Sequence, residues 1–515
     1  MAMDRIQDEV FAFLRSPSAW GEQSPRVETI ETHGALVFMA GDQVMKVRRA
    51  VRLPYLDFST LAARRRFAER ELALNAPHAP GLYRDVIAIT REIDGSLAVG
   101  GNGTPVEWVV RMARFGQEAL LTAVVEREGL PEPLAKTLAD TIFDYHAAAP
   151  RSNVTGDSIA ALWQSIQSAL ASASDARVQA VTMRLDQSAR SALEKTAVVR
   201  DERARSGHIR RCHGDLHLGN IVLWQGRLVP FDAIEFDETL ATVDTLYDLA
   251  FLLMDLDRHQ ARDAANIIFN RYLWRSGDLR DLQGLAAMPL YLALRAAIRA
   301  VVALDRAKLC VSDMNTAVLA ALKSLWRAEA YLTPATPWLI AIGGLSGTGK
   351  TTLAKALAPS IGAVPGALHV RSDLERKWLA KVVETERLPE GAYTAEASQA
   401  VYERVLARAQ AALQAGQCVI ADAVFARAAE RDELEAVAQR IGCRFSGLWL
   451  TGQPEVLKAR VQARVGDASD ATACVVEQQT WIETGMISWT NIDVACDVQD
   501  SLRQAQTILA VDAHQ

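Results

Sequence analysis

The sequence predicts two domains, an N-terminal α+β domain with two lobes and a C-terminal α/β domain built on a parallel sheet. A chain of 515 residues is longer than one hydrophobic core usually supports. The segment Tyr331–Trp338, YLTPATPW, breaks helices with two prolines. Before it, β-like runs give way to long Ala- and Leu-rich stretches, and after it strand and helix patterns alternate. We expect domains at 1–332 (lobes of about 1–114 and 115–332) and 338–515.

The composition is that of an ordinary soluble protein. The apolar fraction is 50%, the charged fraction is 23%, and the formal net charge is −6. This charge excludes wholesale attraction to nucleic acid or to anionic membranes. The six cysteines form no C-x-x-C pair, and the first residues, MAMDRIQDEVFAFLRS, lack the uninterrupted apolar run of a signal peptide. We expect a cytoplasmic protein with reduced thiols.

One apolar stretch, residues 284–304, is long enough to suggest a membrane span. Arg295 and Arg299 lie four residues apart within it and therefore on one face of a helix. Because a charge at mid-bilayer is costly, the stretch predicts a buried amphipathic helix and no membrane partner.

The first 115 residues are predicted to form a small sheet and one helix. ALVFMAGDQVMKVRR alternates as a hairpin does, with AGD at the turn and Lys46 on the second strand. DFSTLAARRRFAERELALNAPHAP predicts a helix that Ser59 or Thr60 caps. DVIAIT and VEWVVRMARF complete the sheet, and the following residues up to the linker are predicted to be mostly helical apart from NIVLW and RLVPFD.

Five residues occur in the order that a protein-kinase-like site requires. Phosphoryl transfer needs positioned phosphates, Mg²⁺ and a lysine to neutralise their charge, and a carboxylate to receive the proton of the acceptor hydroxyl. RCHGDLHLGN places an Asp and an Asn five residues apart, and VPFDAIEF adds a second Asp. The set, in chain order, is Lys46, Glu71, Asp215, Asn220 and Asp232.

Each member of this set has a predicted role. Lys46 would pair with the α- and β-phosphates, and Glu71 would hold its ammonium group, although Glu69 competes for that role. Asp215 would be the base. Asn220 and Asp232 would bind Mg²⁺.

The same segments resemble a known superfamily. CHGDLHLGNIVLW and LVPFDAIEF resemble the core of the aminoglycoside phosphotransferase and choline kinase superfamily, and VFMAGDQVMKV, LDFSTLAARRRFAERELALN and LYRDVIAIT are similar to a bacterial branch often fused to a P-loop kinase. The resemblance covers most of residues 25–330. It implies a bilobal protein-kinase-like fold with the roles given above, and it implies that Asp248 in DLAFLLMDL braces the catalytic loop.

The sequence departs from this superfamily at two places. The loop expected to cover the nucleotide, ETHGALVF, contains one glycine. Arg48-Arg49-Ala50 stands where a Lys-Lys-Pro run is expected. We interpret His213 and His217 as structural residues of the catalytic loop.

A second phosphate-binding motif follows the linker. GGLSGTGKTT matches G-x4-G-K-[ST] between an apolar strand, WLIAIGG, and a helix, TLAKALA. Backbone N–H groups close around the β-phosphate at the helix N-terminus, Lys350 spans the β- and γ-phosphates, and Thr351 binds Mg²⁺. The nucleotide-binding residues expected are Gly344, Ser346, Gly347, Thr348, Gly349, Lys350, Thr351 and Thr352.

Side chains beyond the next strands indicate transfer to an acceptor. Asp373 and Arg376 can face the crevice outside the strand ends, Asp373 as a base and Arg376 to dock the acceptor. Asp422 ends a third strand and is a candidate metal ligand. Arg460 and Arg464 would share one helix face in LKARVQAR and reach the transferring phosphate. A helix N-cap is the alternative for Asp373, and a solvated helix face is the alternative for the two arginines.

This half resembles the small P-loop kinases, the group that includes gluconate kinase, the zeta toxins and the kinase domain of polynucleotide kinases, over about residues 338–500. We expect two ATP- and Mg²⁺-dependent kinase sites that act on small-molecule hydroxyl groups of a sugar, an amino sugar or an aminoglycoside-like compound. One alternative is a polynucleotide or nucleotide-sugar kinase, although the acidic C-terminal half disfavours a long nucleic acid. Another is a nucleotide-dependent switch that regulates the other half or a partner protein. The acceptors, the choice of ATP or GTP and the oligomeric state stay open.

Overall fold

The computed structural model describes residues 2–21, 26–31, 34–53, 56–152, 158–309, 314–464, 466–494 and 498–513. The chain forms two compact units. Unit 1 comprises residues 1–166, 204–255 and 299–321, and unit 2 comprises residues 167–203, 256–298 and 322–515. This division groups segments by packing, and the domain boundary at residues 332–338 stays a prediction.

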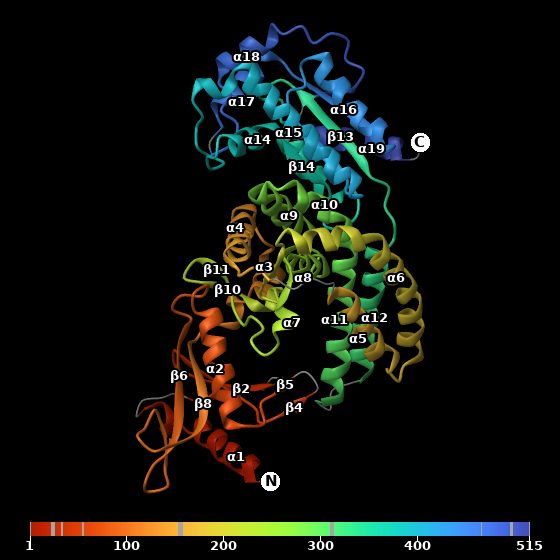
Figure 1. The fold of residues 1–515 in the computed structure, drawn as a ribbon. Coiled ribbons are helices and arrows are strands. Elements are labelled where there is room, and N and C mark those ends of the chain that lie inside the picture. Colours follow the sequence, from red (N-terminus) through yellow and green to blue (C-terminus); the bar gives the residue numbers. More distant parts are fainter. Residues whose placement is uncertain are drawn as a thin grey trace. The chain divides into compact units, whose positions relative to one another are not determined.

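Unit 1 contains an antiparallel sheet in the strand order β1-β2-β3-β8-β6-β7 (Figure 1). Its strands are β1 (Glu28–Glu31), β2 (Ala35–Ala40), β3 (Gln43–Arg48), β6 (Tyr83–Arg91), β7 (Leu97–Val99) and β8 (Thr104–Ala113). The predicted hairpin of β2 and β3 turns at Gly41, whose φ of 57° suits a residue without a side chain. A short pair, β4 (Arg52–Leu53) and β5 (Leu56–Asp57), follows the hairpin. The loop ETHGALVF contains Thr32 and His33, which lie outside the described residues.

Each face of this sheet packs against a different helix. Helix α1 (Ala2–Arg15) shares a core with Met45 and Val47 of β3. Helix α2 (Leu61–Asn75) packs on the opposite face, where Val44 belongs to a second core. Thr60 caps α2 by accepting a hydrogen bond from the Ala63 N–H at 3.1 Å, as one of the two predicted caps. Because strand side chains alternate between faces, Lys46 points to the α2 side of the sheet.

The rest of unit 1 is mostly helical, as predicted. Its elements include α3 (Leu121–Glu128), α4 (Glu132–Ala148), α7 (Glu238–Ala241) and α8 (Thr245–Arg258), with the strand pairs β9 (Ile209–Arg211) with β12 (Thr242–Asp244) and β10 (Ile221–Trp224) with β11 (Arg227–Pro230). The predicted catalytic loop runs between β9 and β10, and Asp232 lies two residues after the end of β11.

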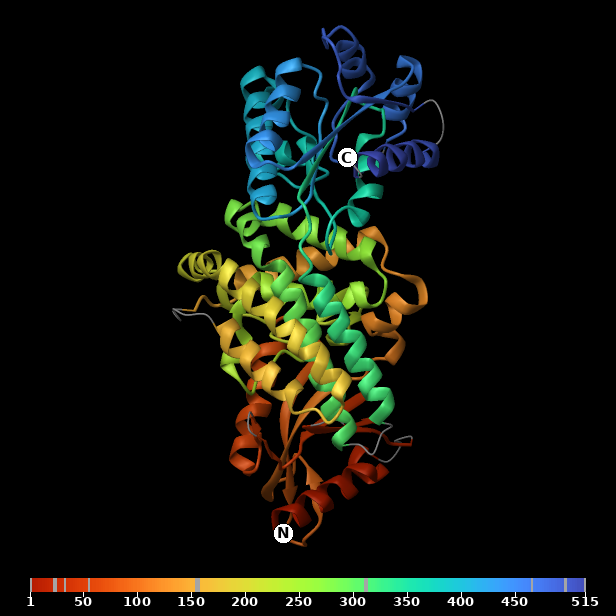
Figure 2. The same ribbon diagram turned by 90° about the vertical axis from the view of Figure 1, so that its right-hand side faces the viewer.

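Unit 2 contains a parallel sheet in the order β14-β15-β13-β16-β17. Its strands are β13 (Trp338–Gly344), β14 (Leu368–Arg371), β15 (Val419–Asp422), β16 (Arg444–Thr451) and β17 (Thr490–Asp493). Helices α15 (Ala395–Gln414) and α16 (Ala428–Ile441) cover one face, and α13 (Lys350–Leu357) and α19 (Val498–Ala513) cover the other (Figure 2). The helices α14 (Ser372–Leu379), α17 (Pro454–Gln462) and α18 (Ala473–Thr480) complete this part. The C-terminal half therefore has the predicted α/β architecture.

Unit 2 also contains helices that precede the linker in the chain. They include α9 (Arg262–Ser276), α10 (Leu279–Gly284), nearly all of α6 (Ala176–Arg205) and the second part of α12 (Met314–Tyr331). Two asparagines of α9 bind the backbone at the start of the edge strand β14: Asn266 donates at 3.0 Å to the carbonyl of Ala367, the residue before β14, and Asn270 accepts from the His369 N–H within β14 at 2.6 Å. These side chains satisfy backbone groups that an edge strand leaves unpaired.

One helix of the described residues is long and apolar enough to cross a membrane. It spans Leu279–Ala307, and 67% of its most apolar window is buried inside the protein. Arg295 is 4% exposed. Such burial is equally typical of a soluble core helix, which is what the two arginines predict. Among the described residues, Cys212, Cys418, Cys443 and Cys474 form no disulfide, and Cys310 and Cys496 lie outside the described residues.

Two candidate phosphoryl-transfer sites

Lys46 lies between the two carboxylates that the sequence predicts for it. Its Nζ lies 2.8 Å from Glu71 Oε1 and 2.6 Å from Asp232 Oδ1. Glu69 pairs instead with Arg65 at the surface, at 2.8 Å. Burial by itself lowers the pKa of Lys46, but Asp232 and Glu71 outweigh burial and raise it. The ammonium is therefore charged and fixed in place.

The catalytic loop joins the predicted base to the predicted metal ligand. Asn220 Nδ2 donates to the backbone carbonyl of Asp215 and to its carboxylate, each at 2.9 Å. This orientation leaves Asn220 Oδ1 available to a cation. Burial raises the pKa of Asp232, and Lys46 and Arg48 lower it overall, so this carboxylate is ionised. An amide oxygen and an ionised carboxylate are oxygen donors of the kind that Mg²⁺ prefers.

Asp248 braces the catalytic loop from within the core. Its carboxylate is fully buried and accepts hydrogen bonds from the N–H groups of His213 at 3.1 Å and Gly214 at 2.9 Å. His146 Nε2 lies 3.2 Å from the same carboxylate. The ring of His213 lies 2.9 Å from the Phe231 carbonyl, and His217 Nδ1 accepts from the Gly219 N–H. These contacts fit the bracing predicted for Asp248 and the structural interpretation of both histidines.

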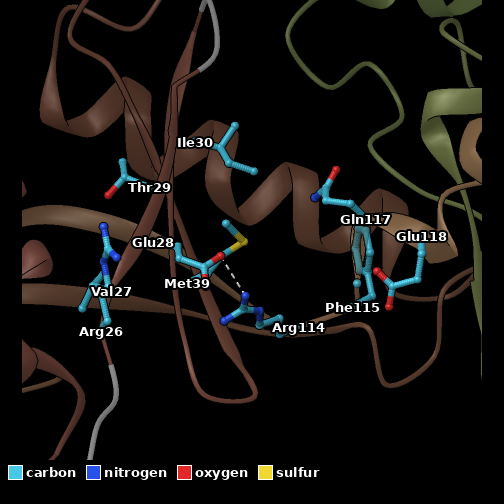
Figure 3. A pocket seen from close by; sticks show the side chains of 11 residues that line it. Arg26, Val27, Glu28, Thr29, Ile30, Met39, Arg114, Phe115, Gln117 and Glu118 are labelled. Atoms are coloured by element: carbon cyan, nitrogen blue, oxygen red, sulfur yellow. Dashed lines mark hydrogen bonds and ion pairs between the residues drawn. The ribbon is translucent and has the colours of Figure 1, made fainter.

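A cavity of about 720 Å³ lies at the edge of the unit 1 sheet, in the size range of small-molecule sites. Figure 3 shows Glu28 of β1 and Arg114 joined by an ion pair of 2.8 Å, with Phe115, Gln117 and Glu118 near the end of β8. The Phe115 ring packs on Phe231 with centroids 5.4 Å apart, and Phe231 precedes Asp232. Sequence reasoning missed this cavity because its walls come from segments without a motif.

Sequence reasoning also missed two charged residues beside Glu71. Arg48 contacts Glu71 Oε2, and its Nη2 lies 2.6 Å from Glu235 Oε1. Burial, with help from Glu71, raises the pKa of Glu235 to about 7, although Arg48 opposes the shift. Two features of the sequence could have revealed this pair. Residues 46 and 48 are two apart on one strand and so face the same side of the sheet, and VPFDAIEF contains Glu235 close to Asp232.

The glycine motif of unit 2 forms a backbone cradle. Gly347 and Gly349 have φ values of 87° and 89°, which favour glycine. A Cβ atom at Gly344 would lie 2.4 Å from the Leu450 carbonyl oxygen, so the loop approaches its neighbours closely. The Ser346 N–H donates to Gln479 Oε1 at 2.8 Å. Thr348 is buried, while Lys350, Thr351 and Thr352 begin α13.

The ends of the adjacent strands bring a metal-type pair beside this cradle. Thr351 Oγ1 donates to Asp422 Oδ2 at 2.6 Å, and His369 Nε2 lies 3.2 Å from the same oxygen. Burial raises the pKa of Asp422, but the hydrogen bond from His369 and nearby cations bring it down to about 2. A hydroxyl and an ionised carboxylate again suit Mg²⁺.

Among the residues that the structure describes, no carboxylate lies within ion-pair distance of the Lys350 ammonium. Its Nζ donates to the Leu345 carbonyl at 3.0 Å. Burial lowers its pKa and outweighs the attraction of Asp422 and Asp373, while Arg464 and Arg371 add smaller lowering contributions. The glycine loop thus surrounds a buried lysine whose charged form would be favoured by a bound anion.

Asp373 and Arg376, the two residues predicted to act on the acceptor, each contact other groups of the protein. Asp373 is in the first turn of α14, 36% exposed, and Arg371 Nη2 lies 3.5 Å from it; Arg371 is also the N-terminal flanking residue of α14, so Asp373 is not the N-cap. Arg376 donates to the Ala392 carbonyl at 2.6 Å and stacks on the Tyr393 ring. Its docking role stays a prediction.

Arg460 and Arg464 do not share one helix face, contrary to the prediction. Helix α17 ends at Gln462, so Arg464 lies beyond it. Arg460 donates to the Val494 carbonyl at 3.0 Å. Arg464 contributes to lowering the pKa of Lys350, and Arg371, which the sequence did not suggest, pairs with Asp467.

Known proteins match the chain both in part and over nearly its whole length. A family model described as an AAA domain matches residues 339–481. A choline/ethanolamine kinase family protein from Mesorhizobium loti is 17% identical, with a TM-score of 0.38, and the match covers 64% of this chain and 99% of that one. A gluconokinase from Sinorhizobium meliloti 1021 is 22% identical, with a TM-score of 0.26, and the match covers 34% of this chain and 93% of that one.

Two mycobacterial relatives match nearly end to end. An uncharacterized protein of Mycobacterium tuberculosis (strain ATCC 25618 / H37Rv) is 30% identical over 501 residues, which is 94% of this chain and 95% of that protein. An uncharacterized protein of Mycobacterium bovis (strain ATCC BAA-935 / AF2122/97) matches to the same extent. The chain therefore belongs to the family of these mycobacterial proteins, and its residues 339–481 match an AAA domain.

Proposed function

We propose that both sites are active ATP-dependent kinases, each of which transfers the γ-phosphoryl group to a hydroxyl group of a small molecule. The observation that supports the proposal is a group of side-chain contacts: Lys46 lies 2.8 Å from Glu71 and 2.6 Å from Asp232, Asn220 donates to Asp215, and Thr351 donates to Asp422. A sugar, an amino sugar or an aminoglycoside-like compound is the acceptor class that we favour. The protein works in the cytoplasm, without a membrane partner.

In unit 1, Lys46 would neutralise phosphate charge while Glu71 holds its ammonium. Asp215 would accept the proton of the acceptor hydroxyl, and its bond from Asn220 orients its carboxylate. Bound Mg²⁺, held by Asn220 and Asp232, supplies charge neutralisation on the phosphates. The cavity beside Phe115 would take the nucleotide base.

In unit 2, the backbone of the glycine loop would bind the β-phosphate at the N-terminus of α13. Lys350 would exchange its carbonyl contact for the β- and γ-phosphates, which restores a counter-charge to a cation that burial disfavours. Thr351 and Asp422 would hold Mg²⁺. Asp373 would act as the base toward the acceptor.

The two reactions would run in sequence on one metabolite or independently on two. A polynucleotide acceptor is disfavoured because contacts to phosphates need lysine and arginine, and the C-terminal half is acidic. A regulatory role for one half remains the competing hypothesis.

The test measures ATP consumption by wild type, Asp215→Ala and Lys350→Ala with sugars, amino sugars, aminoglycosides and nucleosides. We expect each substitution to abolish phosphorylation of a different acceptor or of a different hydroxyl group. If Lys350→Ala only changes the rate of an Asp215-dependent reaction, the P-loop half is a regulator. If neither variant alters any turnover, the proposed chemistry is wrong.

A further inference from the structure

Strand β3 presents two cations to the same face of its sheet. Lys46 and Arg48 are two residues apart, so both side chains point toward α2, while Met45 and Val47 belong to the core on the α1 side. The side chain of Arg48 is 7% exposed, and its guanidinium lies 4.8 Å from the centroid of the Phe58 ring. A buried arginine in this position needs carboxylate partners.

Arg48 has two such partners, and they come from different parts of unit 1. It contacts Glu71 Oε2, whereas Lys46 binds Oε1 of the same carboxylate. Its Nη2 also lies 2.6 Å from Glu235 Oε1. The side chains of Glu71 and Glu235 are 0% and 4% exposed. Two cations and three carboxylates, counting Asp232, thus form one cluster.

Glu235 belongs to the short segment that carries the metal-binding aspartate. Asp232 has a φ of 61°, an uncommon backbone conformation for a residue with a side chain. Backbone hydrogen bonds hold the segment on both sides: Asp232 N–H donates to the Tyr83 hydroxyl at 3.1 Å, and Ala233 N–H donates to Asn75 Oδ1 at 2.9 Å. The Arg48–Glu235 pair is a further attachment of this segment to the sheet.

The two ion pairs that join β3 to this segment differ in one respect. Lys46 holds Asp232 directly, so that contact competes with any cation that Asp232 binds. Arg48 holds Glu235, three residues farther on, and this contact can persist while Asp232 turns to a cation. Because Arg48 also occupies one oxygen of Glu71, it leaves the other oxygen to Lys46.

We propose that Arg48 and Glu235 are positioning residues that clamp the metal-binding segment to strand β3, so that Asp232 meets Mg²⁺ while Lys46 stays on Glu71. The inference rests on the proposed function of unit 1 as a Mg-ATP site. Arg48 and Glu235 touch neither substrate nor metal and act through Glu71 and Asp232.

The experiment measures ATP affinity by titration calorimetry, with Mg²⁺ and with EDTA, in full-length Lys350→Ala protein, which removes the P-loop lysine. Arg48→Met, Glu235→Gln and their combination are compared with this parent. Loss of a residue that orients a metal ligand typically weakens metal affinity about 10- to 100-fold. We expect the gain in ATP affinity on adding Mg²⁺ to fall by about that factor, while affinity in EDTA changes little.

Two further comparisons separate positioning from general damage. Arg49→Met removes the neighbouring exposed pair of Arg49 and Glu31, which is 2.6 Å long, and should leave both affinities unchanged. The double variant should bind Mg-ATP no more weakly than either single variant, because Arg48→Met and Glu235→Gln each remove the same contact. Glu235→Gln is nearly isosteric and keeps the test valid if Arg48→Met does not fold.

Equal weakening with Mg²⁺ and with EDTA, or additive losses in the double variant, would overturn the clamp alone. Absence of Mg-ATP binding in the Lys350→Ala parent would overturn the proposed function of unit 1 and the clamp with it.

Discussion

The two candidate sites hold the lysines that are predicted to bind phosphate in opposite electrostatic surroundings. Lys46 is held by Glu71 and Asp232, and these carboxylates raise its pKa. Lys350 contacts one backbone carbonyl, and burial with two nearby arginines lowers its pKa. In unit 1, carboxylates of the protein therefore neutralise the charge of Lys46 before a nucleotide binds. In unit 2, neutralisation of Lys350 depends on the phosphates of the nucleotide.

The difference follows from what builds each site. In unit 1, side chains from a strand, a helix and a loop surround the lysine, and these carboxylates must be neutralised for the fold to be stable. In unit 2, glycine backbone forms the cradle, and N–H groups at a helix N-terminus already favour an anion. We therefore expect Lys46 to stabilise the fold, and we expect Lys350 to serve nucleotide binding at a cost in stability.

The largest effect is expected for Lys46→Met. It leaves Glu71 fully buried with Arg48 as its remaining strong partner, and Asp232 without its lysine. Removing one partner of a buried ion pair costs about 3–5 kcal/mol of unfolding free energy. Scanning calorimetry of the nucleotide-free protein should show unit 1 unfolding earlier, while Arg49→Met should change it little. An unchanged transition would show that the cluster does not support the fold.

Gly347→Ala should damage the backbone cradle. Gly347 has a φ of +87°, and a Cβ there would lie 2.6 Å from the Leu457 carbonyl oxygen. Strain and overpacking of this kind cost roughly 1–3 kcal/mol. Mg-ATP should also lose its stabilisation of unit 2 in thermal melts. Gly391→Ala is the matched control, because its Cβ would meet nothing within 4 Å. Normal nucleotide protection in Gly347→Ala would contradict the cradle.

Glu235 should give unit 1 a pH dependence of its own. Burial, Glu71 and Asp232 raise its pKa from 4.5 to about 7 against the attraction of Arg48 and Lys46. The folded state then holds this proton more tightly than the unfolded state, so stability falls as pH rises from about 4.5 through about 7. The difference in unfolding free energy between Glu235→Gln and wild type should shift in favour of the variant by on the order of 1–2 kcal/mol as the pH rises from 5 to 8. A gap that does not change with pH would refute this.

Local spacing explains why much of both sites could be predicted from sequence. Asp215 and Asn220 share one loop, and the glycine motif is contiguous between a strand and a helix. Lys46 and Glu71 followed from the order of strand and helix. The roles of these residues stay predictions, but the contacts among Lys46, Glu71 and Asp232 agree with the predicted order.

The features that the sequence did not predict depend on packing between distant segments. Glu235 meets Arg48 only after the loop folds against β3. Asn266 and Asn270 of α9 bind the backbone at the start of β14, although the linker separates them in the chain. Helix α17 ends before Arg464, which a helical pattern alone does not reveal. Tertiary contacts decide such details, and local periodicity does not record them.

The smallest effect, and the one of opposite sign, is expected for Lys350→Met. When folding lowers the pKa of a lysine, its charged form destabilises the folded protein at every pH below the unfolded pKa, which is near 10.4. This destabilisation disappears only as the pH rises from the folded pKa toward the unfolded pKa. At neutral pH, removal of the charge should therefore leave the nucleotide-free midpoint of unit 2 unchanged or slightly higher, in contrast to Lys46→Met. The same variant should lose protection by Mg-ATP in that unit. If it instead unfolds as early as Lys46→Met does, Lys350 is neutralised by partners comparable to Glu71 and Asp232, and the contrast between the two sites fails.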